Sequence, residues 1–329
     1  MSKRQSVVHQ AVEVLKKIEA FGTKRHGDKK NAINNKLQYD TYTKSKIYSY
    51  NTFKHTQNTV IPFVKFCREQ YGIKYLLEIK PEYFTEFIKR GNATTGEKYE
   101  KNTAATYATH IKKFENGFNK ILGTNLKFYT NDYKNYVQED KQVKKQMPRQ
   151  VHDKIIDRAY STSVDNGRAL ELARNLGLRV GEITKLKPQD FKFKNDGKLD
   201  KVHIHKSKGG KSRDISAKSL TTKQSNKVVE IYKHYSNLRP EENIFKNKAE
   251  SYGKAFSRCR NWIISNSRDK KEDYEYCGVH SMRKEFAQDF YEREVEENGR
   301  DEREVKEELT EILGHNRLSV LDAYLKSYH

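Results

Sequence analysis

Residues 313–324 read LGHNRLSVLDAY and place His315 nine residues before Tyr324, near the end of a chain of 329 residues. Tyr328 follows four residues after Tyr324, so on a helix the two tyrosines would share one face. A terminal aromatic helix usually packs onto a core. Whether one of these tyrosines is instead reactive depends on the polar residues that the rest of the chain can bring beside it.

The charge of the chain favours a polyanionic partner. Its 65 lysines and arginines outnumber its 44 aspartates and glutamates, so the formal net charge is +21. A surplus of this size is typical of nucleic-acid binding. The alternative is a lysine-rich surface that only aids solubility.

The cysteine pattern and the hydropathy exclude several protein classes. Cys67, Cys259 and Cys277 form an odd set without a CxxC pair, which argues against a disulfide framework and a zinc site. No apolar run is long enough for a membrane span, and the N-terminal residues do not resemble a secretory signal. The sequence therefore predicts a soluble cytoplasmic protein with reduced, packed thiols and no membrane partner.

Changes in pattern divide the chain into four segments. Residues 1–40 hold a short amphipathic helix and a basic, loop-like stretch, which is either an arm that touches DNA or a mobile end. Residues 41–125 are predicted to form a compact helical unit. Residues 126–147 lose helical periodicity and carry many charges, as a linker would, and residues 148–329 form the second unit.

The predicted fold class is mainly α with a small antiparallel β-sheet, the sheet lying in an α+β second unit. Two short alternating runs on either side of Gly209 and Gly210 predict a β-hairpin. Apolar residues at helical spacing predict helices over 151–163, 166–177, 221–235, 251–267 and 278–294.

Four local patterns of the second unit carry polar groups. Arg179 could simply pair with Glu182 across one helical turn, and a basic hairpin tip could simply face solvent. The three-residue spacing of HSMR puts its histidine and its arginine on one helical face. The patterns are Arg179 in NLGLRVGEI, the hairpin residues Lys206, Lys208, Lys211 and Arg213, His280 with Arg283, and His315 with Tyr324.

These groups fit one another chemically. Two arginines can each present a planar fork of donors to a phosphate. Histidine and lysine can transfer protons near neutral pH, and a tyrosine hydroxyl can attack phosphorus to form a covalent ester. The sequence shows no clear carboxylate cluster for Mg²⁺, which favours a mechanism in which guanidinium groups neutralise the charge of the transition state.

Taken in order, GLRVGEI, the lysine hairpin, HSMR, and LGH with its tyrosine resemble the tyrosine recombinase, or phage integrase, family of site-specific DNA recombinases. The resemblance covers residues 148–329, and the helical unit before it resembles that family's core-binding domain. It implies a helical SAM-like core-binding domain and a catalytic DNA breaking–rejoining domain, which form a C-shaped clamp on DNA. Each motif alone would be weak, but the ordered set is specific.

The resemblance implies how a phosphate would be held. Arg179 and Arg283 would grip the scissile phosphate and stabilise its pentavalent transition state. Glu182 would support the neighbouring arginine and histidine. His280 and His315 would bind phosphate oxygens or assist proton transfer.

The resemblance also implies the chemical step. Tyr324 would attack the phosphate to give a 3′-phosphotyrosine and a free 5′-hydroxyl, without a cofactor or a metal. Lys208 would protonate the leaving oxygen, with Lys206 and Lys211 as alternatives because the register of the hairpin is open.

The function implied is integration, excision or resolution of a mobile element through a Holliday junction. The partners implied are double-stranded DNA recombination sites, a homo-tetramer on paired sites and, in some systems, accessory DNA-bending proteins. In a prokaryote the protein would associate with the nucleoid. Two alternatives stay open: the same chemistry in a telomere resolvase or a type IB topoisomerase-like enzyme, and a non-catalytic DNA-binding protein on this scaffold.

Three features depart from the family pattern. Lys284 follows the second arginine, where many members have a histidine. The segment 291–311 contains ten acidic and four basic residues, and is either a docking surface for a neighbouring protomer or a solvated helix. The chain ends five residues after Tyr324, which leaves the family's final, trans-packing helix unaccounted for.

Overall fold

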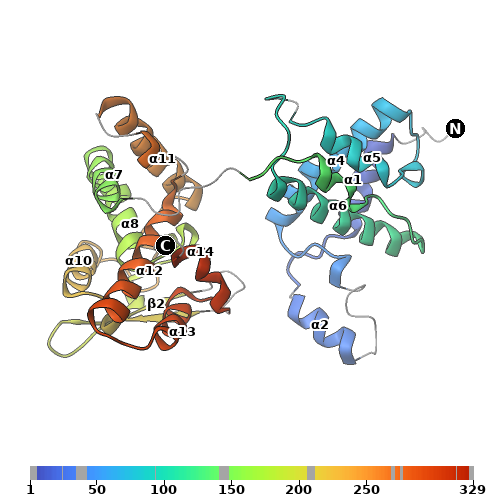
Figure 1. Ribbon diagram of the computed structural model, residues 1–329. Coiled ribbons are helices and arrows are strands. Elements are labelled where there is room, and N and C mark those ends of the chain that lie inside the picture. The colour runs from blue at the N-terminus through green and yellow to red at the C-terminus, as the bar shows by residue number, and fades with distance from the viewer. Residues whose placement is uncertain are drawn as a thin grey trace. The chain divides into compact units, whose positions relative to one another are not determined.

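The chain folds into two compact units, residues 1–142 and 143–329, each with its own hydrophobic core. Both units are mostly helical, and a small antiparallel sheet lies in the second (Figure 1). This arrangement confirms the predicted fold class. The computed structural model describes residues 6–23, 25–34, 43–92, 94–140, 148–205, 212–267, 271–274, 277–315 and 317–325.

The first unit consists of helices whose ends follow ordinary capping rules. Ser6 and Ser49 accept hydrogen bonds from backbone amides of the first turns of α1 and α4, and Gly72 and Gly123 end α4 and α6 in the left-handed conformation. The elements are α1 (Val7–Lys17), α2 (Arg25–Asn34), α4 (Tyr50–Tyr71), α5 (Glu82–Lys89), α6 (Lys101–Leu122) and the 3₁₀ helices Leu76–Glu78 and Asn131–Tyr136.

The predicted boundaries of this unit need correction at both ends. α1 was assigned to an N-terminal arm, but its apolar face packs against α4 and α6 in the core. Ile18, just after α1, lies so close to Gly117 of α6 that a Cβ at this glycine would come within 2.5 Å of it. At the other end Phe128 and Tyr133 are buried in the same core, although the linker was predicted to begin at residue 126.

The second unit is built around α12, which packs against α8, α13 and α14 (Figure 1). α7 lies against α8, and α11 packs against both. The helices are α7 (Arg149–Thr162), α8 (Val164–Asn175), α9 (Val180–Ile183), α10 (Thr222–Lys233), α11 (Ala249–Asn266), α12 (Val279–Tyr291), α13 (Glu302–Leu313) and α14 (Asp322–Leu325), with a π-helix at Glu292–Glu297 and shorter 3₁₀ turns.

The sheet contains the predicted hairpin and one further strand. β2 (Leu199–Ile204) pairs antiparallel with β3 (Arg213–Ser216), and Val202 lies opposite Ile215 on the buried side. β1 (Phe191–Phe193) pairs with the other edge of β2 and was not predicted. The hairpin tip, residues 206–211, lies outside the described residues.

The acidic segment 291–311 is helical but is not an isolated solvated helix. Val305 and Leu309 of α13 are fully buried in the core of the second unit. On the outer side Arg300 binds Glu294 at 2.9 Å and Glu308 at 2.8 Å. One face of the segment thus belongs to the core, and part of its negative charge is neutralised within the segment.

Two further features concern the cysteines and the composition of the helices. Cys67, Cys259 and Cys277 are buried free thiols, as predicted. Burial raises the pKa of Cys67 to about 12, so this thiol stays protonated at neutral pH. Among the described residues, no helix combines the length and the apolar composition needed to cross a membrane.

We expect Gly177→Ala to lower the free energy of unfolding of the second unit by about 2–3 kcal/mol. Gly177 has φ +58°, and a Cβ there would lie 2.6 Å from the ring of Phe286, which is buried. Gly197→Ala is the matched control, because Gly197 has φ +79° with nothing within 4 Å and would lose only about 1 kcal/mol. Trp262, the single tryptophan, lies in this unit and reports its unfolding in urea. Equal losses for the two variants would contradict this packing.

Candidate active site

The predicted site residues that the structure describes all belong to the second unit. Arg179 and Glu182 lie at the start of α9, His280 and Arg283 in the first turns of α12, His315 just after α13, and Tyr324 in α14. Lys208, its alternatives Lys206 and Lys211, and Tyr328 lie outside the described residues.

Two glycine turns direct these segments toward one another. Gly177 ends the turn after α8 with φ +58°, and Arg179 two residues later is the N-cap of α9. Gly314 ends α13 with φ +63°, and the His315 amide then donates to the Thr310 carbonyl at 2.8 Å. Both turns use the left-handed conformation that glycine adopts without strain.

Glu182 accepts hydrogen bonds from two arginines of the site. It is 2% exposed, and it accepts from the Arg179 amide at 2.9 Å and from Arg179 Nη1 at 2.9 Å. Arg213 donates to both of its oxygens, at 2.8 and 2.9 Å. The expected pairing of Arg179 with Glu182 is therefore present, within a larger cluster.

Arg213 is a member of this cluster that the sequence analysis placed only at a basic hairpin tip. Its Nε donates to the Ile312 carbonyl at 2.6 Å, so it also connects β3 to the end of α13. The alternation of the strand contains the signal, because Arg213 must point to the same side as the buried Ile215.

Arg283 is the most enclosed of the described cations of the site. It has no exposed surface, and it donates to the Gly177 carbonyl at 2.5 Å and to the Leu313 carbonyl. Among the described residues its Nε has no hydrogen-bond partner. Burial, followed by the charge of Arg179, lowers the pKa of Arg283 to about 10, so the guanidinium stays charged at neutral pH.

Tyr324 lies between two histidine rings and is 4% exposed. Its hydroxyl is 3.1 Å from His280 Nε2, and the ring centroids of His280 and His315 are each 5.4 Å from its own. His315 Nε2 is also 3.4 Å from Arg283 Nη2. His315 and Tyr324 therefore lie against His280 and Arg283 of the HSMR motif.

The surroundings of the two site histidines favour their neutral form. Desolvation, then the charge of Arg283, lowers the pKa of His315 to about 4. The same causes lower the pKa of His280 to about 4, although this residue reaches the surface. A neutral imidazole can accept a proton from the Tyr324 hydroxyl.

We expect NMR titration of His280 and His315 to give pKa values well below the ordinary value of about 6.5 in the free protein. Because the unfolded chain then binds protons first, the stability contributed by these neutral histidines is complete above about pH 6.5 and is lost as the pH falls toward 4. A bound phosphate would raise both pKa values by opposing the arginine charges. Titration of both residues near pH 6.5 in the free protein would contradict the desolvated, cationic environment.

Lys284 is the residue that follows Arg283 in the sequence. It is half-buried on α12, and burial lowers its pKa. Within the described part of the chain, no group of three or more His, Cys, Asp or Glu side chains is placed to hold a metal ion.

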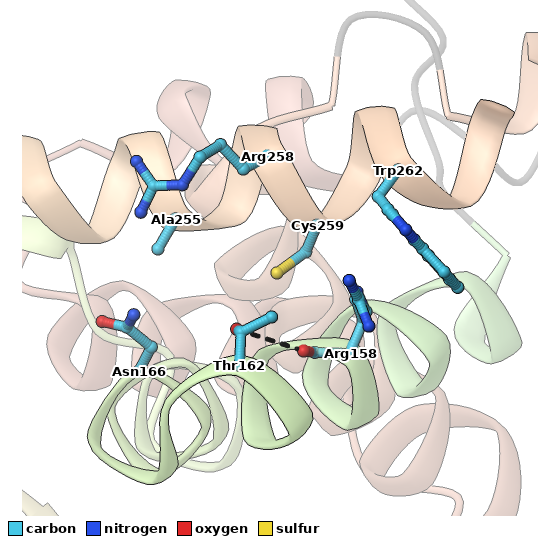
Figure 2. A pocket seen from close by; sticks show the side chains of 7 residues that line it. All are labelled: Arg158, Thr162, Asn166, Ala255, Arg258, Cys259 and Trp262. Carbon is cyan, nitrogen blue, oxygen red and sulfur yellow. Dashed lines mark hydrogen bonds between the residues drawn. The ribbon is translucent and has the colours of Figure 1, made fainter. Parts of the chain in front are cut away.

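A hollow of about 290 Å³ lies between α11 and the α7–α8 junction, and none of the candidate site residues lines it. Figure 2 shows the Arg158 guanidinium against the ring of Trp262, with a distance of 3.8 Å to the ring centroid. Arg258 and Cys259 line the hollow from α11, and none of the described residues that line it is acidic. Arg158 and Arg258 thus place two guanidinium groups at this hollow.

The phage integrase family model matches residues 137–329, which is more than half of the chain. The chain belongs to the phage integrase family. The matched segment includes Arg179, Glu182, Arg213, His280, Arg283, His315 and Tyr324, and corresponds closely to the second unit. No curated protein matches the sequence.

Solved structures of a recombinase and of two integrases bound to DNA have a similar fold. The XerH site-specific recombinase bound to palindromic difH substrate, a post-cleavage complex, is 15% identical with a TM-score of 0.60, and the match covers 99% of this chain and 94% of that one. A lambda integrase dimer bound to a COC′ core site is 14% identical (TM-score 0.58; 91% and 95% covered). The Tn1549 transposon integrase in complex with circular intermediate DNA is 12% identical (TM-score 0.56; 92% and 95% covered).

Proposed function

We propose that this protein is a site-specific DNA recombinase that cleaves and rejoins DNA strands through a covalent 3′-phosphotyrosine. One observation carries the proposal: the Tyr324 hydroxyl is 3.1 Å from a neutral histidine, His280, inside the cluster formed by Arg283, Arg179 and Glu182. A protein that only binds DNA needs basic surfaces. It does not need a buried tyrosine hydroxyl beside a histidine and two arginines.

The chemical step follows from these groups. Tyr324 Oη attacks the scissile phosphorus and passes its proton to His280 Nε2, which is unprotonated at neutral pH. Arg179 and Arg283 neutralise the charge that builds up on the phosphate oxygens. The bond to the 5′ oxygen breaks, and this oxygen takes a proton, for which Lys208 is the sequence-based candidate.

The ester conserves the energy of the broken bond. Attack by a 5′-hydroxyl on the phosphotyrosine reverses the step, so the strand can be rejoined to its own end or to another without ATP. Exchange of two strand pairs in this way produces a Holliday junction and then a recombinant.

A phosphate can reach Arg283 only if a side chain moves. Arg283 has no exposed surface, and His315 and Tyr324 both lie beside it. We propose that these two side chains turn aside as DNA binds, which leaves the unpartnered Nε of Arg283 free to donate to a phosphate oxygen.

The partners we propose are double-stranded DNA sites and further copies of this chain, with the first unit as the core-binding domain. The solved relatives include a lambda integrase tetramer bound to a Holliday junction, which supports a tetramer on paired sites. A topoisomerase-like or telomere-resolving enzyme would share the cleavage chemistry. Recombinant products from a two-site substrate favour the recombinase, whereas relaxation of supercoils alone or hairpin products favour these alternatives.

We expect cleavage to survive EDTA, and DNA affinity to fall steeply with salt. Two fixed guanidinium groups take the place of a metal in this mechanism. Contacts to about six phosphates would lower the affinity about a thousandfold between 50 and 200 mM salt. Fluorescence anisotropy measures the affinity, and a nicked suicide substrate traps the adduct. Strict dependence of the adduct on Mg²⁺ would contradict the mechanism.

A further inference from the structure

The backbone carbonyl of Tyr324 accepts a hydrogen bond from a residue that has no role in the proposed cleavage step. Gln288 of α12 is 2% exposed, and its Nε2 donates to the Tyr324 carbonyl at 2.9 Å. Because a carbonyl oxygen can only accept a hydrogen bond, the amide must present its nitrogen to it. A buried amide is costly unless it is bonded, so an apolar residue would serve better here if packing were the only requirement.

The helix α14 is too short to be stable without tertiary contacts. It has four residues, Asp322–Leu325, whereas an isolated helix needs about 12 or more to be stable in water. Its stability must come from tertiary contacts, and it packs on α12. The buried Leu321 anchors its start, and the Tyr324 amide donates to the Leu321 carbonyl at 2.7 Å.

α12 therefore contacts both ends of Tyr324. His280, in its first turn, lies at the hydroxyl, and Gln288, two turns later, holds the carbonyl. Arg283 lies between them on the same helix. The helix that provides a phosphate ligand thus also fixes the main chain from which the nucleophile extends.

We propose that Gln288 is a positioning residue for strand cleavage, which holds Tyr324 within the active site of its own chain. The hydrogen bond fixes the main chain of Tyr324 while the phenol turns to admit a phosphate, so that the hydroxyl returns to the phosphorus of the same site. This inference rests on the proposed function and adds the means by which the nucleophile is held.

The first test compares the rate of adduct formation by the wild type and Gln288→Leu, a variant of similar size without a donor. With enzyme in excess over a suicide substrate, we expect adduct formation to slow about ten- to a hundredfold, because loss of alignment acts on the bond-forming step. DNA affinity should change less than about twofold, since no phosphate contact is altered.

Phe290→Leu is the matched control for lost stability. Phe290 is buried on the same helix and forms no hydrogen bond or aromatic ring contact with Tyr324 among the described residues, so this variant weakens the core without removing a polar contact of the nucleophile. Lower stability reduces the amount of active protein, and so the final yield of adduct, whereas misplacement of Tyr324 reduces the rate. A wild-type rate in Gln288→Leu, or an equal slowing in Phe290→Leu, would overturn the role of Gln288.

The second test mixes Tyr324→Phe with Arg179→Ala on paired sites. Neither chain has a complete site, so a nucleophile that Gln288 keeps in its own chain gives no adduct in the mixture. An adduct in the mixture would show that Tyr324 reaches a neighbouring chain, and would overturn the proposal. The wild type is run in parallel: if it also forms no adduct, the proposed function fails and not this inference.

Discussion

Replacing Tyr324 with phenylalanine is expected to abolish the covalent protein–DNA adduct while DNA binding is retained. The phenylalanine ring keeps the buried position between His280 and His315, and only the attacking oxygen is lost. The stability cost should be about 1 kcal/mol, the usual value for one hydrogen bond. Gel analysis of a suicide substrate, with anisotropy for the affinity, measures both properties.

Tyr328→Phe is the control for this experiment. Both tyrosines belong to the same terminal segment, but only Tyr324 has the nine-residue spacing from His315. The Tyr328 variant should form adduct at the wild-type rate. Persistent adduct in Tyr324→Phe, with loss of adduct in Tyr328→Phe, would move the nucleophile to Tyr328.

The second large effect is expected when either arginine is replaced by alanine. The two replacements should differ in how much they destabilise the fold. Arg179→Ala and Arg283→Ala should each slow cleavage at least a hundred- to a thousandfold, as when one preorganised donor to the transition state is lost. The Arg179 side chain is 19% exposed, and Arg213 still donates to both oxygens of Glu182 when Arg179 is removed, so this change should cost the fold only about 1–2 kcal/mol.

Arg283→Ala should in addition destabilise the second unit by about 3 kcal/mol or more, because it leaves buried groups unpaired. The groups left behind are the backbone carbonyls of Gly177 and Leu313. Urea unfolding followed by Trp262 fluorescence separates this loss from the loss of rate. Equal stability of the two variants would contradict the buried bridging role of Arg283.

The sequence alone was enough to predict features that depend on residues close together in the chain. Regular apolar spacing predicted the helices of the second unit, and the pair of glycines predicted the hairpin formed by β2 and β3. The ordered polar motifs predicted which residues would lie close together. The structure does place them in one cluster, formed by Arg179, His280, Arg283, His315 and Tyr324. Their catalytic roles remain predictions.

The sequence was insufficient where a residue's partner is distant in the chain. Arg213 reaches Glu182 across 31 positions, and Gln288 reaches Tyr324 across 36, so no local spacing could indicate either contact. α1 was assigned to an arm for a similar reason, because its apolar stripe does not reveal which surface will cover it. The short strand β1 lacks the length at which alternation is convincing.

The most direct test of the central claim is to identify the amino acid that is joined to DNA. The protein would be trapped on a nicked suicide substrate and digested, and the DNA-linked peptide sequenced by mass spectrometry. The account predicts a single modified residue, Tyr324, linked to a 3′ phosphate and accompanied by a free 5′-hydroxyl. A linkage to any other residue, or to a 5′ phosphate, would contradict it.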